Sequence, residues 1–305
     1  MIKYIGKRVL FSLVSLLALI TVTFFLTRMM PGNPFQLENI NPSVQEQILK
    51  QYGLDRPVGE QFLLYLKNLS HGDLGMSYKK TGISVNSLIA ADAPYTIRLG
   101  LIAYGVALVL GVLIGIWMAV TKKESVRGGL MFLTICGISI PNYVLALLLV
   151  LIFGVTLQWF PVVGLSTWKH YVLPVITLSV YPIAQISKLV KSSYTEAKNQ
   201  DYTIMARAKG ISRARISMVH IMKNAMVPVI TISGPMIAFL LTGSFVAENI
   251  FTIPGIGREF VNAVGSRDYT VIMGLTIFLG MLLIVCNLVA DILCTLVDPR
   301  IKLEK

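Results

Sequence analysis

Long apolar runs, separated by shorter polar segments, dominate the pattern of hydrophobic positions along the chain. A helix that crosses about 30 Å of hydrocarbon needs about 20 mostly apolar residues. Six runs reach that length, so we predict an all-α membrane protein with six transmembrane helices. The predicted spans are Val9–Met30, Thr96–Val120, Leu130–Leu157, Tyr171–Val190, Met226–Ala247 and Val271–Val297.

Two features refine these spans. The third span contains Pro141, and prolines also lie in the fourth and fifth. Because proline removes a helical hydrogen bond, bends are compatible with these spans. The first span follows Lys3, Lys7 and Arg8, as a signal peptide would. It is too long for the apolar region of a signal peptide, and no small-residue cleavage site follows, so we expect it to be retained.

The composition supports a membrane protein, and the distribution of Lys and Arg predicts which segments face the cytoplasm. Of the 305 residues, 55% are hydrophobic and 14% are charged, against about 25% charged in soluble domains. The net charge is +12, and 16 Lys and Arg fall within segments 1–8, 121–129, 191–225 and 298–305. Segments 31–94, 158–170 and 248–270 are longer together but hold only 8. Since basic residues collect on the cytoplasmic side, both termini are predicted to be cytoplasmic. An even number of spans places both termini on one side, which agrees with this prediction.

Residues 31–94 therefore face outside, and the pattern predicts a small folded cap. Ser43 and Glu46 have the spacing of a capping box for a helix that Gly53 would end. Pro57 suits the first turn of a second helix that continues through Leu69. A solvated linker is the alternative, which the leucines of the second helix disfavour.

The longest inner loop, 191–225, is basic and has a glycine in its middle. Gly210 predicts a left-handed turn between two amphipathic helices. Helical spacing places Ile204, Ala208 and Ile211 on one face before the turn. After the turn the apolar stripe comprises Ile211, Ala214, Met218, Ile221, Met222 and Ala225. Such a pair could lie on anionic headgroups or dock into a groove of a partner, and charge alone does not separate the two.

Motifs for chemistry are absent from the sequence. It contains no GxxxxGK[ST] phosphate loop, no GxSxG nucleophile elbow, and no HExxH or CxxC metal motif. We expect no enzymatic activity, no metal site, no cofactor and no nucleic-acid partner. Asp291 is the one acid well inside an apolar run, and either a functional role or pairing with a basic loop residue would explain it.

Seven further stretches of the chain are informative together. In order, they are "MMPGNPF", "YGLDRP" with "GDLGMS", "SIPNYVLALLLVLIFGV", "WFPVVG", "DYTIMARAKGISRARISMVHIMKNAMVP", "ENIFTIPGIGREFVNAVGSRDY" and "LVDPRI". These stretches resemble one known family, the permeases of binding-protein-dependent ABC importers, and within it the oligopeptide, dipeptide and nickel group (OppB/DppB-like). Gly210 lies in "ARAKGIS", which is similar to that family's EAA loop. Against the wider superfamily, Ile204 replaces the usual Glu and Lys223 the usual late Pro, as is common in this group.

The resemblance implies an architecture and a set of partners. It implies the six-helix type I importer permease with an N-terminal helix (1–30), an external cap (31–94), a permease core (95–297) and a cytoplasmic tail (298–305). The implied partners are a second homologous permease, two cytoplasmic ABC ATPase subunits that bind ATP and Mg, an extracytoplasmic peptide-binding protein and membrane lipid. The implied location is the bacterial cytoplasmic membrane.

The resemblance also implies two sets of site residues. One is the ATPase-coupling set around the glycine joint: Ala206, Arg207, Ala208, Lys209, Gly210, Arg213 and Arg215. The other is a candidate outer gate: Glu248, Pro254, Gly255, Gly257, Arg267 and Asp268. Oligopeptide is the favoured cargo, with dipeptides or nickel as alternatives. A self-contained secondary transporter would need midplane ion ligands and internal repeats, neither of which is visible, and a membrane enzyme would need a nucleophile or metal set.

Overall fold

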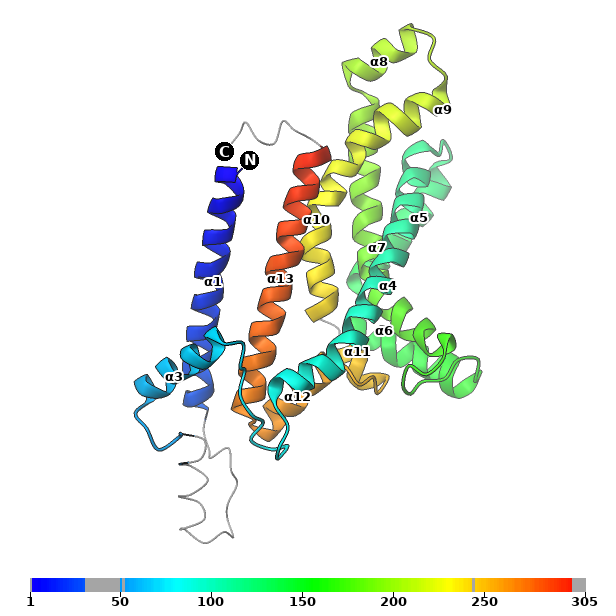
Figure 1. The fold of residues 1–305 in the computed structure, drawn as a ribbon. Coiled ribbons are helices and arrows are strands. Elements are labelled where there is room, and N and C mark those ends of the chain that lie inside the picture. The colour runs from blue at the N-terminus through cyan, green and yellow to red at the C-terminus, as the bar shows by residue number, and fades with distance from the viewer. Residues whose placement is uncertain (1, 31–49, 51–52, 243–244, 298–305) are drawn as a thin grey trace. The chain divides into compact units, whose positions relative to one another are not determined.

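The computed structural model describes residues 2–30, 50, 53–242 and 245–297, and every named element within these ranges is a helix (Figure 1). The chain divides into two compact units. The cap unit comprises residues 2–94 and 258–281, and the bundle unit comprises 95–257 and 282–305. The predicted capping pair Ser43 and Glu46 and the predicted tail, 298–305, lie outside the described residues.

In the cap unit, the long helix α1 (Ile2–Met29) packs against the short helix α3 (Val58–Ser70). The ring of Phe24 lies 5.1 Å from that of Phe62 and 6.3 Å from that of Tyr65, centroid to centroid. The predicted second helix of the cap is confirmed as α3, with Pro57 at its N-cap position, one residue before the first turn. Gly53 has a positive φ of 64°, but the first helix that it was predicted to end lies largely outside the described residues.

The bundle unit contains most of the remaining spans. These are α4 (Val85–Val120), α7 (Trp168–Lys198), α10 (Met222–Thr242) and α13 (Tyr269–Val297), the first and last of which extend into the cap unit. Short helices α11 (Phe245–Ile250) and α12 (Ile256–Ser266) follow α10. Within the described residues, five helices are long and apolar enough to cross a membrane, or six if one bent pair counts as a single span.

The bent pair corrects the predicted third span. Instead of one helix there are α5 (Glu124–Ser139) and α6 (Asn142–Leu149), the latter continued by the π-helix η1 (Val150–Thr156), with a bend of 102° between them. The break lies at Pro141, and Ile140 before it has an extended ψ of 119°. Proline lacks the N–H that would continue the helix, and its ring disfavours the helical conformation at the preceding residue.

Helices α4 and α7 approach closely through glycines of the GVLIG stretch. A Cβ added to Gly115 would lie 2.6 Å from Val190 Cβ and 2.7 Å from the Ser187 carbonyl oxygen. A Cβ on Gly111 would lie 2.8 Å from Ile186 Cβ. Small residues permit such backbone approach between membrane helices. Gly111 and Gly115 therefore allow α4 to pack closely on α7.

We predict that Gly115→Ala destabilises the folded protein by about 1–3 kcal/mol, since the methyl group has no room. Gly105→Ala, on the same helix but with nothing within 4 Å of the added Cβ, is the matched control and should leave stability unchanged or slightly raised. Thermal unfolding of the detergent-solubilised protein measures both variants. Equal midpoints for the two variants would contradict close packing of α4 on α7.

Candidate functional site

The basic loop between α7 and α10 folds as a helical hairpin at one end of the bundle unit. The helix α8 (Asp201–Ala208) follows α7 after two residues, and both α8 and α9 lie beyond the end of α7 in Figure 1. The hydroxyl of Thr203, which is fully buried, donates a hydrogen bond of 2.8 Å to the Ala197 carbonyl oxygen. This bond attaches α8 to the end of α7.

Gly210 ends α8 in a Schellman motif. The Gly210 N–H donates to the Arg207 oxygen at 3.0 Å, and the Ile211 N–H donates to the Ala206 oxygen at 3.2 Å. Gly210 has a φ of 73°, in the left-handed region that this motif requires. A side chain there would meet no atom within 4 Å, so backbone strain alone restricts the position. The predicted glycine joint is thereby confirmed.

The chain returns through α9 (Arg213–Arg215) and the π-helix η2 (Ile216–Ile221) into α10. Ser212 caps this segment, and its hydroxyl accepts a hydrogen bond from the Arg215 N–H at 3.4 Å. The Tyr194 hydroxyl of α7 bonds the Ser217 hydroxyl at 2.7 Å. A small apolar core lies beneath the hairpin and comprises Tyr194, Ala197, Ala206, Ile216, Ile221 and Ala225.

The predicted faces of the hairpin are wrong in part. Ile204, Ala208, Ala214 and Met218, expected on the apolar faces, are exposed, whereas Thr203, Ala206 and Ile216 are buried. Two physical causes account for the difference. The turn at Gly210 separates Ile211 from the helix before it, and the π-helical turns of η2 contain more residues than the 3.6 that the spacing rule assumes.

An exposed apolar surface, which we call the loop face, results from this register. It consists of Ile204 (55% exposed), Met205 (58%), Met218 (69%) and Val219 (53%). Arg207, Lys209, Arg213 and Arg215 of the coupling set, together with Ala208, are exposed beside it. Ala206 is only 6% exposed, so its side chain supports the hairpin from within.

Four of the candidate gate residues lie in the bundle unit, from α11, which contains Glu248, to the start of α12, which contains Gly257. The Glu248 side chain is fully buried, and its Oε1 accepts a hydrogen bond of 2.8 Å from the Thr96 hydroxyl. The same hydroxyl accepts a bond of 2.9 Å from the Ile256 N–H. A Cβ on Gly255 would lie 2.5 Å from Glu248 Oε2, so only glycine fits there. Pro254 precedes this glycine.

Thr96 thus joins α4 to Glu248 of α11, which is 152 residues away in the sequence. Sequence analysis missed it, because a threonine at the end of a span carries no motif of its own. Gly257 closes the loop between α11 and α12, since a Cβ there would lie 2.5 Å from Phe245 Cα.

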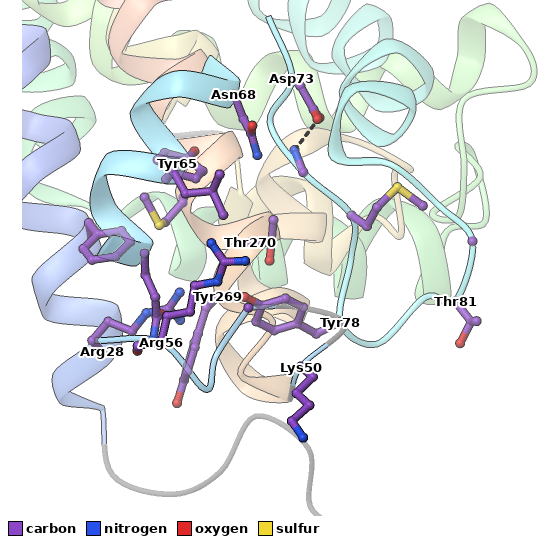
Figure 2. A pocket seen from close by; sticks show the side chains of 18 residues that line it. Arg28, Lys50, Arg56, Tyr65, Asn68, Asp73, Tyr78, Thr81, Tyr269 and Thr270 are labelled. Carbon is purple, nitrogen blue, oxygen red and sulfur yellow. Dashed lines mark hydrogen bonds between the residues drawn. The ribbon is translucent and has the colours of Figure 1, made fainter. Parts of the chain in front are cut away.

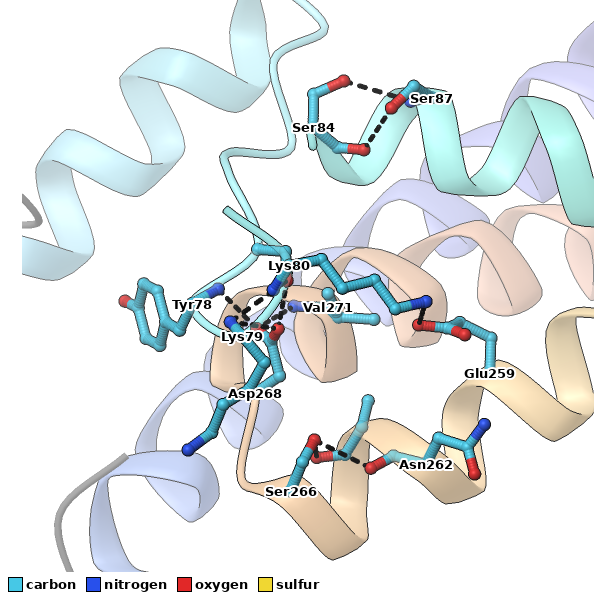
Figure 3. Close-up of polar contacts among 12 residues, drawn as sticks. Tyr78, Lys79, Lys80, Ser84, Ser87, Glu259, Asn262, Ser266, Asp268 and Val271 are labelled. Carbon is cyan, nitrogen blue, oxygen red and sulfur yellow. Dashed lines mark hydrogen bonds and ion pairs between the residues drawn. The ribbon is translucent and has the colours of Figure 1, made fainter. Parts of the chain in front are cut away.

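The other two candidate gate residues, Arg267 and Asp268, lie in the cap unit. Figure 3 shows the contacts of Asp268. Arg267 has a positive φ of 59° where α12 ends. The buried carboxylate of Asp268 accepts hydrogen bonds from the Tyr78 N–H at 3.1 Å, the Lys79 N–H at 3.1 Å and the Ser77 hydroxyl. It also accepts a bond of 3.3 Å from the first turn of α13. Asp268 therefore caps α13 and holds the segment after α3.

Comparison with known proteins gives consistent matches. A family model described as "Binding-protein-dependent transport system inner membrane component" matches residues 111–303. A model of the N-terminal part of the membrane component of such systems matches residues 1–99.

Curated relatives match over the whole chain. The dipeptide transport system permease protein DppB of Bacillus subtilis is 40% identical, with 100% of this chain and 99% of the relative covered. DppB of Lactococcus lactis subsp. cremoris is 39% identical, and the match covers 99% of this chain and 100% of the relative. The oligopeptide transport system permease protein OppB of Haemophilus influenzae is 40% identical, also covering 99% and 100%.

Two solved structures share the fold. One is an inward-facing MetNI methionine ABC transporter, with a TM-score of 0.56 at 15% identity, covering 69% of this chain and 96% of that one. The other is an amino acid ABC transporter, with a TM-score of 0.52 at 16% identity, covering 70% and 94%. The predicted type I permease architecture is therefore confirmed.

We predict that Thr96→Val destabilises the protein by about 1–3 kcal/mol, because it removes a donor to the buried Glu248 and the acceptor for the Ile256 N–H. Thr177→Val is the matched control, since the buried Thr177 hydroxyl bonds only the Leu173 carbonyl of its own helix. Thermal unfolding in detergent should show a lower midpoint for Thr96→Val alone. If Thr177→Val lowers the midpoint as much as Thr96→Val does, the hydrogen bonds of Thr96 have no special role in stability.

Proposed function

Because this chain belongs to the family of binding-protein-dependent transport system inner membrane components, we propose that it is the permease subunit of an ATP-driven peptide importer. The observation that carries the proposal is identity of 38–40% over the full length with permeases of dipeptide and oligopeptide systems. Similarity across the whole chain, cap included, is more specific than similarity of the core alone. We propose oligopeptides as the first cargo and dipeptides as the second.

In this proposal, separate ATPase subunits supply the energy for transport. The sequence has no phosphate loop, so the chain hydrolyses no ATP itself and holds no cofactor. A second homologous permease would complete the pathway, two cytoplasmic ATPase subunits would bind ATP and Mg, and an external binding protein would deliver the peptide. The distribution of Lys and Arg supports an inner-membrane orientation with both termini and the basic loop in the cytoplasm.

The loop face is the proposed contact with an ATPase subunit. Four exposed apolar side chains on a short helical hairpin suit insertion into a groove of another protein. The surrounding Arg207, Lys209, Arg213 and Arg215 would then meet acidic groups at the rim of that groove or the headgroups nearby. Since Thr203 and the core beneath the hairpin attach it to α7, motion of the hairpin would be passed to the bundle.

The proposed outer gate comprises two separately built parts. Glu248, Gly255 and their neighbours form a rigid loop on α4 through Thr96. Arg267 and Asp268 belong to the cap unit, where Asp268 fixes the start of α13. Cross-links from this segment to the second permease should differ between ATP and ADP, and identical patterns would exclude a gating role.

Uptake of a labelled pentapeptide tests the proposed function directly. Cells that lack this chain but keep its partner genes should lose uptake, and restoring the chain should restore it. Labelled dipeptide and nickel ions, measured in parallel, identify the cargo. Unchanged uptake of both peptides would contradict a peptide permease.

Replacing the glycine joint tests the coupling role. Gly210→Val forces a branched side chain into a left-handed turn, at a cost of about 1–2 kcal/mol. We therefore expect reduced peptide uptake and loss of the stimulation of ATPase activity by peptide-loaded binding protein. Gly210→Asn is the control, because asparagine tolerates this conformation, and it should keep most of both activities. Wild-type coupling in Gly210→Val would disprove the role of the joint.

A further inference from the structure

A cavity of about 590 Å³ lies within the cap unit, between the end of α1, α3 and the start of α13 (Figure 2). This volume is in the range of small-molecule sites. Aromatic and apolar side chains form much of the wall, among them Phe24, Tyr65 and Tyr269. Arg28, Lys50 and Arg56 also line it, against one carboxylate, that of Asp73, so the described lining residues carry a net positive charge.

Polar atoms without partners gather in this cavity. Among the described residues, six buried side-chain nitrogen or oxygen atoms have no hydrogen-bond partner, and five belong to residues that line it. They are Arg28 Nε and Nη1, Tyr65 Oη, Thr270 Oγ1 and Gln61 Oε1. A buried polar group without a partner costs about 1–3 kcal/mol. Such a concentration in one cavity indicates a ligand that supplies the missing partners.

The chemistry of these atoms specifies the ligand. The guanidinium of Arg28 lies 5.1 Å from the ring centre of Phe24 and 5.7 Å from that of Tyr269, which fixes its position. Burial, with Asp73 and Tyr78 adding to it, raises the pKa of Tyr65, so its hydroxyl remains a donor. Arg28, Tyr65 and Thr270 thus offer donors to an oxyanion. Gln61 Oε1 and Asp73 offer acceptors to a hydroxyl or ammonium group.

The position of Arg28 indicates where a ligand with an oxyanion would come from. It lies in the last turn of α1, at the end of an apolar stretch long enough to cross a membrane. Only 11% of that stretch is buried inside the protein, and Leu26 and Met29 beside Arg28 are 58% and 78% exposed. Apolar side chains are thus exposed beside Arg28 at the end of a helix of membrane-spanning length, where phospholipid headgroups would lie.

We propose that this cavity binds the headgroup of a membrane phospholipid, with the phosphate on Arg28, Tyr65 and Thr270 and the polar end of the headgroup toward Gln61 and Asp73. Arginine is suited to phosphate because its planar guanidinium donates two parallel hydrogen bonds. The bound lipid would fix α1 to α3 and α13, the helices that form the wall of the cavity.

Native mass spectrometry of the purified permease complex, titrated with phosphatidylglycerol, tests the proposal. Arg28→Gln should weaken one lipid-binding step about tenfold or more, since it removes charge-assisted hydrogen bonds. Tyr65→Phe, which deletes one oxygen, should weaken the same step by a smaller factor. Arg98→Gln is the matched control, because Arg98 also lies over an aromatic ring, that of Tyr171 at 5.6 Å, but does not line the cavity.

Competition with other ligands distinguishes a lipid site from a site for a free anion or a peptide. Inorganic phosphate that displaces the lipid at equal concentration would show that the site takes a free anion. Displacement by a pentapeptide with a free carboxyl terminus, but not by its amide, would make the cavity a peptide site. Either outcome, or wild-type lipid binding in both cavity variants, overturns the proposal. If Arg28→Gln fails to assemble, Tyr65→Phe decides alone.

Discussion

A bilayer core contains no water to satisfy a backbone N–H or C=O, and the architecture depends on this constraint. It explains why the membrane-spanning elements are helices. Where the chain turns outside the spans, buried backbone groups also have local partners, as in any folded protein. At Gly210 the last carbonyls of α8 accept hydrogen bonds from the chain that turns back over them. Between α11 and α12, the Thr96 hydroxyl accepts the hydrogen bond of the Ile256 N–H.

The contact between α4 and α7 is more rigid than the attachment of the loop hairpin to α7. Glycines on α4 bring its backbone against α7, and such contacts leave no space for sliding without a clash. The loop hairpin instead rests on α7 through one buried hydrogen bond, one hydroxyl pair and a small core. A partner that moves the hairpin would therefore move α7 as well, and α4 would move together with α7 because the contact between them stays intact.

Features set by local sequence could be predicted, whereas those set by distant contacts could not. Apolar runs located the spans, Pro57 located the start of α3, and Gly210 located the turn. Pro141 predicted a bend but not its size of 102°, which depends on the packing of α6. The bond between Thr96 and Glu248 joins residues 152 positions apart, and the cavity around Arg28 draws on three separate helices. Neither leaves a periodic signal in the sequence.

The π-helix η2 has a consequence for how related chains can differ. A π-helical segment contains one residue more than an α-helix of equal hydrogen bonding. Deleting one residue within 216–221 would restore α-helical geometry and leave the hairpin in nearly the same orientation relative to α10, because the π-helical turn absorbs the extra residue. The deletion would shift the side chains within the segment, Met218 and Val219 among them, while every membrane-spanning residue kept its place. A change of one residue in length could thus alter part of an exposed surface without any substitution in the membrane.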